Sequence, residues 1–254
     1  MFMRLVQFKI KTDQLSGLRQ EYETVVVPAL GDIDGCRFAG LIHSARNPDE
    51  CMSLTLWNTP DHIEAYERSG KYAELLKGLE PYFSDSSKWK IQLSEDSTLE
   101  YAPVPEEPVV HANPIGAAMD NNAPGQLPRD TMYLRIVYIT IKPGMLDEFR
   151  TIYNEEIIPT LRSVQGCRIA YLTESIENRE QIYSVTIWDS QADAEKYETS
   201  GQFDELTGKI RHTFSELFQW KMELDKQVGG QTATSEDLTI ESYAIVTGRN
   251  FDLK

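Results

Sequence analysis

Apolar and polar residues alternate in two short segments that lie far apart in the chain. The segments VQFKI (residues 6–10) and VYITI (137–141) place an apolar side chain at every second position. This period is typical of a β-strand with one buried face. We therefore predict one strand at each segment.

Helical spacing follows each of these strands. Apolar residues recur every three or four positions, and the run ends near Pro28 or Pro159, which predicts a helix whose last turn holds the proline. Two more strands follow, and then a two-part helical stretch broken at Ser69-Gly70 or Ser200-Gly201. A fourth strand is predicted around KWKIQL and QWKMEL. The order βαββαβ is that of the ferredoxin-like motif, so the predicted fold class is α+β.

The two halves are copies of one another. Residues 5–93 and 136–224 align without a gap at an offset of 131, with 30 of 89 positions identical. Two of the three cysteines, Cys36 and Cys167, recur in the same Gly-Cys-Arg triplet. The chain is therefore a tandem duplication. We interpret the two cysteines as small buried apolar residues, since no neighbouring His or Cys offers a metal site.

The third predicted strand has two unlike faces. One face carries apolar residues that are exchanged between the copies, and the other is the same in both: Ser53, Thr55 and Trp57 in one copy, Ser184, Thr186 and Trp188 in the other. A helix-covered face requires only volume and tolerates exchange. We therefore expect helices on the exchanged face and a more particular contact on the identical face.

The boundaries follow from composition. Repeat 1 spans residues 1–95 and repeat 2 spans 132–226. Residues 96–131 hold six of the twelve prolines and read as a partly extended linker. In the tail, residues 227–254, the segment LTIESYAIVTG favours one added strand.

Charge narrows the range of partners. The net charge of −15 argues against nucleic acid and against an anionic membrane surface, because both require a basic surface on the protein. Three cysteines do not make a disulfide framework, and we find no apolar run long enough for a signal peptide or a membrane span. We expect a cytoplasmic protein.

Several motifs together resemble a known family. Each copy has a helix ending in P-x-L before a Gly-Cys pair, a strand ending in Thr-x-Trp, and Y-E-x-S-G at residues 66–70 or 197–201. In this combination the chain resembles the antibiotic-biosynthesis-monooxygenase-like branch of the dimeric α+β barrel superfamily. The resemblance implies that the two ferredoxin-like repeats pack their sheets into one intramolecular barrel. Homo-oligomers of such pseudo-dimeric chains are left open.

The haem-degrading members of that superfamily are a poor match. Their pattern has an Asn on the first strand, a Trp on the helix after Thr-x-Trp, and a His about ten residues later. This chain has Tyr66 or Tyr197 at the Trp position, with Leu76 or Thr207 at the His position. We expect no cofactor and no metal.

Cofactor-free monooxygenation requires fewer specific residues than haem degradation. The resemblance implies an apolar pocket with an aromatic wall and a few groups that stabilise an anionic substrate. The residues that could supply these are Trp188, Tyr197, Phe203, Arg168, Trp57, Tyr66 and Arg37. Each also has a plain structural interpretation, as core packing for the aromatic residues and as surface ion pairs for the arginines. We place the pocket between the sheet and helices of repeat 2, which has more aromatic residues on its helices.

Two functions remain open at this point. One is a cofactor-independent monooxygenase acting on a small aromatic or quinol-type molecule. The other is a catalytically silent barrel that binds a small molecule or is associated with stress. In both cases the expected partner is a small-molecule ligand.

Overall fold

The computed structural model describes residues 1–93, 99–105, 109–120, 132–174, 180–215 and 238–250 of the chain. The chain divides into two compact units, one of residues 1–3 and 112–245, the other of residues 4–111 and 246–254. The first unit holds repeat 2 and the second holds nearly all of repeat 1. Within the described ranges no helix is long and apolar enough to cross a membrane.

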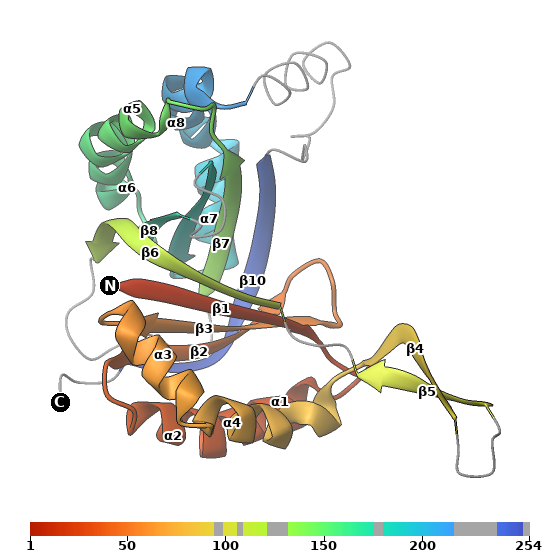
Figure 1. Ribbon diagram of the computed structural model, residues 1–254. Helices are drawn as coiled ribbons and strands as arrows, with labels where there is room; N and C mark the ends of the chain where they lie inside the picture. Colours follow the sequence, from red (N-terminus) through yellow and green to blue (C-terminus); the bar gives the residue numbers. More distant parts are fainter. Residues whose placement is uncertain (94–98, 106–108, 121–131, 175–179, 216–237, 251–254) are drawn as a thin grey trace. The chain divides into compact units, whose positions relative to one another are not determined.

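Repeat 1 is a three-stranded sheet with helices on one face (Figure 1). The strands lie in the order β1-β3-β2. Their bounds are β1 (Phe2–Lys9), β2 (Cys36–Ser44) and β3 (Glu50–Trp57). The helical segments are α1 (Leu15–Glu21), the π-helix η1 (Tyr22–Val26), α2 (Val27–Gly31), α3 (Pro60–Arg68), α4 (Lys71–Leu79) and η2 (Glu80–Tyr82).

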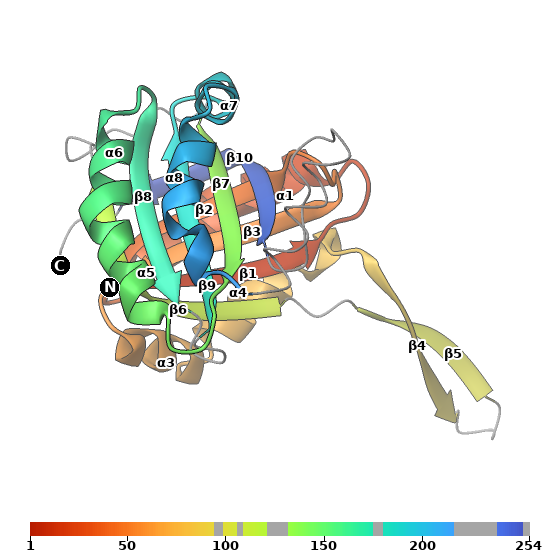
Figure 2. The same cartoon turned by 90° about the horizontal axis from the view of Figure 1, so that it is seen from above.

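Repeat 2 repeats this arrangement, with α5, α6 and α8 lying over its sheet (Figure 2). Its strands are β7 (Tyr133–Thr140), β8 (Cys167–Glu174) and β9 (Gln181–Trp188). Its helical segments are α5 (Leu146–Ile152), the π-helix η3 (Tyr153–Ile157), α6 (Ile158–Ser163), α7 (Gln191–Thr199), α8 (Gln202–Ile210) and η4 (Arg211–Thr213). Strand β9 lies between β7 and β8 and is antiparallel to both.

Two ferredoxin-like α+β halves in one chain confirm the predicted fold class, a pseudo-dimeric α+β fold. The union of the two sheets in a single barrel stays a prediction.

The expected fourth strand of repeat 1 forms but does not join the sheet of that repeat. Strand β4 (Asp85–Leu93) pairs with β5 (Leu99–Pro105) in a separate two-stranded sheet. Just before β4, Phe83 forms an isolated bridge with Ile10, the residue that follows β1. The prediction that β4 closes the repeat was wrong, because the next segment of the chain offers β4 another partner. The matching segment of repeat 2, QWKMEL, lies outside the described residues.

Segments outside the repeats cover both edges of the repeat 2 sheet. Strand β6 (Val109–Asp120), in the predicted linker, is antiparallel to β8, and β10 (Leu238–Asn250), in the tail, is antiparallel to β7. An uncovered edge exposes unpaired backbone N–H and C=O groups. These two strands therefore cover the edges that β7 and β8 would otherwise expose.

The backbone conformation explains why the Gly-Cys-Arg triplet has a glycine in both repeats. Gly166 has φ +82°, and a Cβ atom there would lie 2.5 Å from the Cβ of Asp193. Gly35 has φ +79° and would meet the ring of His62 at 2.2 Å. Only glycine satisfies both the positive φ and the close approach. The cysteines that follow are buried, and burial raises the pKa of the Cys36 and Cys167 thiols to about 12, which leaves them unreactive.

Candidate functional site

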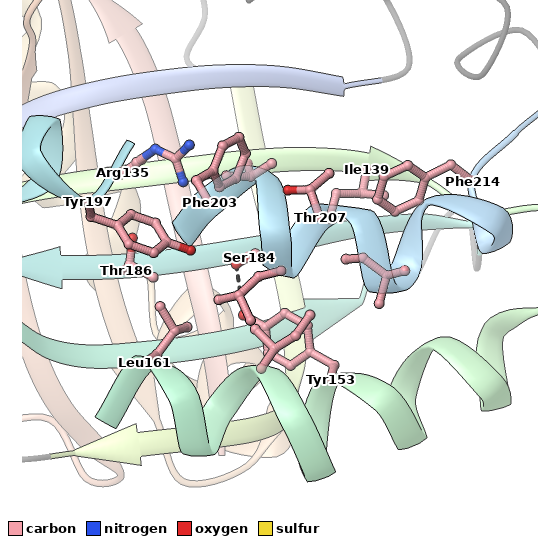
Figure 3. Close-up of a pocket in the computed structure, with 14 residues that line it drawn as sticks. Arg135, Ile139, Tyr153, Leu161, Ser184, Thr186, Tyr197, Phe203, Thr207 and Phe214 are labelled. Atoms are coloured by element: carbon pink, nitrogen blue, oxygen red, sulfur yellow. Dashed lines mark hydrogen bonds between the residues drawn. The ribbon is translucent and has the colours of Figure 1, made fainter. Parts of the chain in front are cut away.

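Each repeat encloses a cavity between its sheet and its helices. The repeat 2 cavity has about 460 Å³ of space not filled by atoms, part of it open to solvent, and the repeat 1 cavity has about 440 Å³. Figure 3 shows the residues that line the first, which are Arg135, Val137, Ile139, Tyr153, Ile157, Leu161, Ser184, Thr186, Tyr197, Phe203, Leu206, Thr207, Ile210 and Phe214. Every one of them has its counterpart, 131 positions earlier, in the lining of the other cavity.

The strand pattern creates the floor of each cavity. Arg135, Val137 and Ile139 alternate along β7, so they share one face, and Ser184 and Thr186 do the same on β9. The identical face of the third strand is therefore the face that the helices cover. Our expectation that helices cover the exchanged face was wrong. Both faces of β3 and β9 are largely buried, so apolar exchange alone could not identify the helix side.

Arg135 is the most unusual residue in the lining. Its side chain is 2% exposed, and its Nε donates to Oε1 of Glu198 at 2.5 Å. Its Cζ lies 4.2 Å from the centroid of the Phe203 ring, as seen at one end of the cavity in Figure 3. Its Nη2 is buried and has no hydrogen-bond partner among the residues that the structure describes. A buried charged donor without an acceptor is costly, so this atom marks a place where a ligand oxygen would be stabilised.

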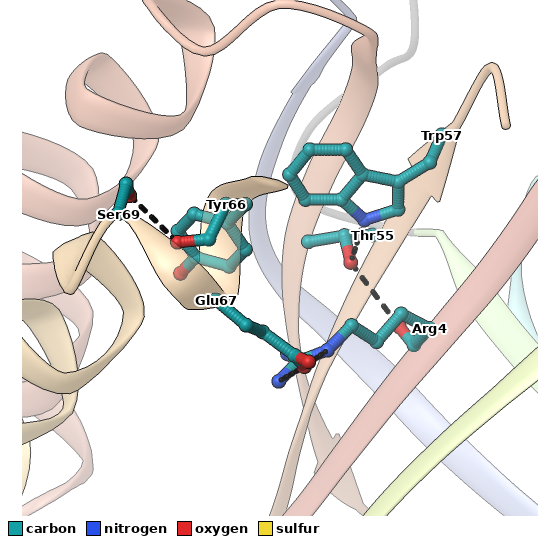
Figure 4. A network of polar contacts seen from close by, with 6 residues as sticks. All are labelled: Arg4, Thr55, Trp57, Tyr66, Glu67 and Ser69. Atoms are coloured by element: carbon teal, nitrogen blue, oxygen red, sulfur yellow. Dashed lines mark hydrogen bonds and ion pairs between the residues drawn. The ribbon is translucent and has the colours of Figure 1, made fainter. Parts of the chain in front are cut away.

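Arg4 is the counterpart in repeat 1, and two of its nitrogens donate to Glu67. Both Nε and Nη2 donate to Oε1 of Glu67, at 3.2 and 3.0 Å. Figure 4 shows this pair beside a chain of bonds in which the indole of Trp57 donates to Thr55 at 2.8 Å, and Thr55 donates to the Arg4 carbonyl at 3.3 Å. The Cζ of Arg4 lies 4.3 Å from the ring centroid of Tyr72.

Tyrosine hydroxyls lie deep in both cavities. Tyr153 shares a hydrogen bond of 2.8 Å with Ser184, and Tyr22 shares one of 2.8 Å with Ser53. Each tyrosine is the first residue of a π-helix, a local widening that is frequent at functional sites. Burial raises the pKa of Tyr153 to about 12, and burial also raises the pKa of Tyr197 far above its usual value. Both therefore stay neutral near pH 7, able to donate a hydrogen bond but not to act as a base.

The aromatic residues selected from the sequence in repeat 2 pack against one another, and two of them line the cavity. Trp188 is fully buried, donates to Thr186 at 2.9 Å, and does not line the cavity. Its ring lies 5.0 Å from the Tyr197 ring, which in turn lies 6.0 Å from Phe203 in an edge-on contact. Tyr197 and Phe203 line the cavity. Trp57 and Tyr66 form the same pair in repeat 1, with ring centroids 5.2 Å apart.

The two arginines selected from the sequence lie outside both cavities. Arg168 is 44% exposed, and its Nε and Nη2 each donate to Asp189 at 2.7 Å. That carboxylate raises the pKa of Arg168. The strand register shifts between Cys167 and Ile169, at the position of Arg168, as a β-bulge would cause. Arg37 has the same position in β2 and is half-buried.

Sequence reasoning missed Arg4 and Arg135. A signal was present, because each arginine precedes an apolar strand residue by two positions and therefore shares its buried face. In both copies, this strand position places a charged arginine side chain on the buried face of the sheet. It also missed the tyrosine–serine pairs, although Tyr153 and Ser184 are identical to their counterparts in repeat 1.

A metal centre finds no support in the described part of the chain. There, no three His, Cys, Asp or Glu side chains come together in a group that could hold a metal ion.

Comparison with known protein families identifies a family that matches both repeats. The family model described as antibiotic biosynthesis monooxygenase matches residues 1–77 and 132–207. Among curated proteins, no sequence matches the chain.

Solved structures share the fold at low sequence identity. A putative monooxygenase from Fusobacterium nucleatum superposes with a TM-score of 0.67 at 11% identity, covering 98% of this chain and 94% of that one. One from Lactobacillus acidophilus gives 0.67 at 8% identity, covering 98% and 95%. A protein described as anthrone oxidase-like gives 0.59 at 14% identity, covering 98% and 92%. The family model matches more than half of the residues, in both repeats, and the chain therefore belongs to the antibiotic biosynthesis monooxygenase family as a tandem duplication of its domain.

Proposed function

We propose that the protein is a cofactor-independent monooxygenase that oxidises a small phenol or quinol-type aromatic molecule in the repeat 2 cavity. The observation that carries the proposal is the buried guanidinium of Arg135, whose Nη2 lacks a partner inside a cavity walled by Tyr197 and Phe203. Family membership supports the reaction class.

The reaction needs only the substrate and dioxygen. The phenolate form of the substrate transfers one electron to O₂, and the resulting radical and superoxide combine to form a C–O bond at a ring carbon. The hydroperoxide then loses water and leaves a quinone. One oxygen atom enters the product, and the other leaves as water with the hydrogens of the ring C–H and the phenol O–H. The substrate supplies all the electrons, so no external reductant is required.

Arg135 would favour the reactive anion. A unit charge 4 Å from a guanidinium gains about 4 kcal/mol at an effective dielectric constant of about 20, which corresponds to a fall of about three units in the pKa of the phenol. Glu198 reduces this effect, but its side chain is 39% exposed and screened by water, whereas the guanidinium is buried. Preorganised charge of this kind is effective in catalysis because it needs no reorganisation.

The remaining lining residues are suited to dioxygen, the second reactant. The described lining includes no carboxylate and no imidazole, so the substrate proton would leave to solvent. At the end of the cavity away from Arg135, Ile139 and Phe214 provide an apolar surface (Figure 3). Dioxygen is apolar and would be accepted there.

Oxygen uptake tests the proposal. The purified protein is incubated with naphthols, hydroquinones and anthrone, which is included because one structural neighbour is described as anthrone oxidase-like. We expect uptake of one O₂ per quinone formed with at least one compound, and no stimulation by added flavin, nicotinamide or haem. Thermal stabilisation by these compounds without any oxygen uptake would contradict the proposal and favour the silent binding protein.

A further inference from the structure

We propose that the two cavities bind aromatic ligands in different protonation states: the repeat 2 cavity holds a phenol as its anion, and the repeat 1 cavity is a second site that holds a neutral ring. The repeat 2 half rests on the proposed function for the class of ligand. The repeat 1 half goes beyond it, because it adds a binding site that the reaction does not require.

The first observation is the unequal use of two equivalent arginines. In repeat 1, Glu67 accepts from both Nε and Nη2 of Arg4. In repeat 2, Glu198 accepts from Nε of Arg135, and Nη2 has no partner within the described part of the chain. An oxyanion can take the place of the missing acceptor in repeat 2. In repeat 1 it would have to displace Glu67 from Nη2.

The second observation is a pair of exchanges along the fourth helix of each repeat. Thr207 in repeat 2 replaces Leu76, and Phe203 replaces Tyr72. Figure 3 shows the Thr207 hydroxyl on the side of the cavity towards Arg135. The repeat 2 lining thus has a hydroxyl where the repeat 1 lining has an apolar side chain. In repeat 1 the same two positions hold the apolar side chain of Leu76 and the phenol side chain of Tyr72.

The titratable groups around the two arginines are similar, so they do not offset the difference in hydrogen bonding between Arg135 and Arg4. Arg135 has Glu198, Tyr197 and Tyr153 near it, and Arg4 has Glu67, Tyr66, Tyr72 and Tyr22. The two carboxylates are 39% and 42% exposed, and the two guanidinium side chains are 2% and 3% exposed. What distinguishes the cavities is therefore the buried Nη2 of Arg135, which lacks an acceptor among the described residues, whereas Nη2 of Arg4 donates to Glu67. This favours a neutral phenol or a quinone in repeat 1.

The ligand 4-nitrophenol tests the proposal. Its para position is blocked, so it cannot be converted to a para-quinone, and its phenolate is yellow. Equilibrium dialysis gives the number of bound molecules, and absorbance at a series of pH values gives the ionised fraction. We expect two bound molecules per chain, one of which titrates at least about one pH unit below the free phenol, because the anion binds at least about tenfold more tightly than the neutral form.

Matched variants assign the ionised molecule to a cavity. Arg135→Met should remove the shifted titration, Thr207→Leu should reduce it, and Arg150→Met should retain it, because Arg150 pairs with Asp147 and Glu174 outside the cavity. If Arg135→Met does not fold, the titration of 4-nitrophenol bound to the wild type and to Thr207→Leu still tests the proposal. The proposal is overturned if bound 4-nitrophenol titrates like the free phenol, if only one molecule binds, or if both bound molecules are shifted. A shifted titration without oxygen uptake on the substrate panel would reject the proposed function alone.

Discussion

Arg135→Met is expected to lower kcat/KM for an oxidised phenol by about 10²- to 10³-fold, the usual effect of removing one preorganised group that stabilises developing charge. Methionine fills much of the space of the arginine side chain and removes the buried charge. Because Arg135 would hold the reacting anion, most of the loss should appear in kcat. Steady-state oxygen uptake at several substrate concentrations separates kcat from KM.

The matched control is Arg150→Met. Arg150 belongs to the same repeat and forms ion pairs with Asp147 and Glu174 at the surface. We expect its kcat/KM to stay within about twofold of the wild type, as surface ion pairs contribute little. Equal losses in the two variants, or a folded Arg135→Met protein with wild-type kinetics, would show that the guanidinium of Arg135 has no part in the reaction.

Trp188→Ala is expected to lower the free energy of unfolding by about 3–5 kcal/mol, the range for truncating a large buried aromatic residue. Trp188 is fully buried, packs on Tyr197, and donates a hydrogen bond to the buried Thr186. Chemical denaturation followed by circular dichroism measures the loss.

Phe203→Ala provides the comparison for this core assignment. Phe203 packs at the edge of the same cluster and lines the cavity, so its truncation should cost less stability and weaken ligand binding more. A small stability loss in Trp188→Ala, together with altered ligand binding, would instead place Trp188 among the binding residues.

The periodicity of the sequence predicted the main elements because each repeat forms them from local patterns. Period-two segments became β1 and β7, and the gapless offset predicted two equal halves. The partners of β4, β6 and β10 could not be read in the same way. Strands β6 and β10 pair with edge strands of the repeat 2 sheet, and β4 pairs with β5 from the linker. These long-range pairings do not follow from local periodicity, and the composition around β6, rich in proline, indicated a linker.

The candidate site was predicted in part. Tyr197 and Phe203 could be selected because aromatic residues on a helix face suggest a pocket wall, and they line the cavity. Arg168 was selected as a group that could stabilise an anionic substrate, yet it pairs with Asp189 and does not line the cavity. Arg135 was missed although its strand position indicated a buried face, and its partner Glu198 is 63 positions away in the sequence. Only the fold brings those two side chains together.

A structure of the protein with a bound naphthol tests most directly whether the repeat 2 cavity is the working site. We predict that the ring lies beside Phe203 and Tyr197, with its oxygen about 3 Å from Nη2 of Arg135. A naphthol bound outside this cavity, or bound inside it with its oxygen directed away from Arg135, would contradict the account.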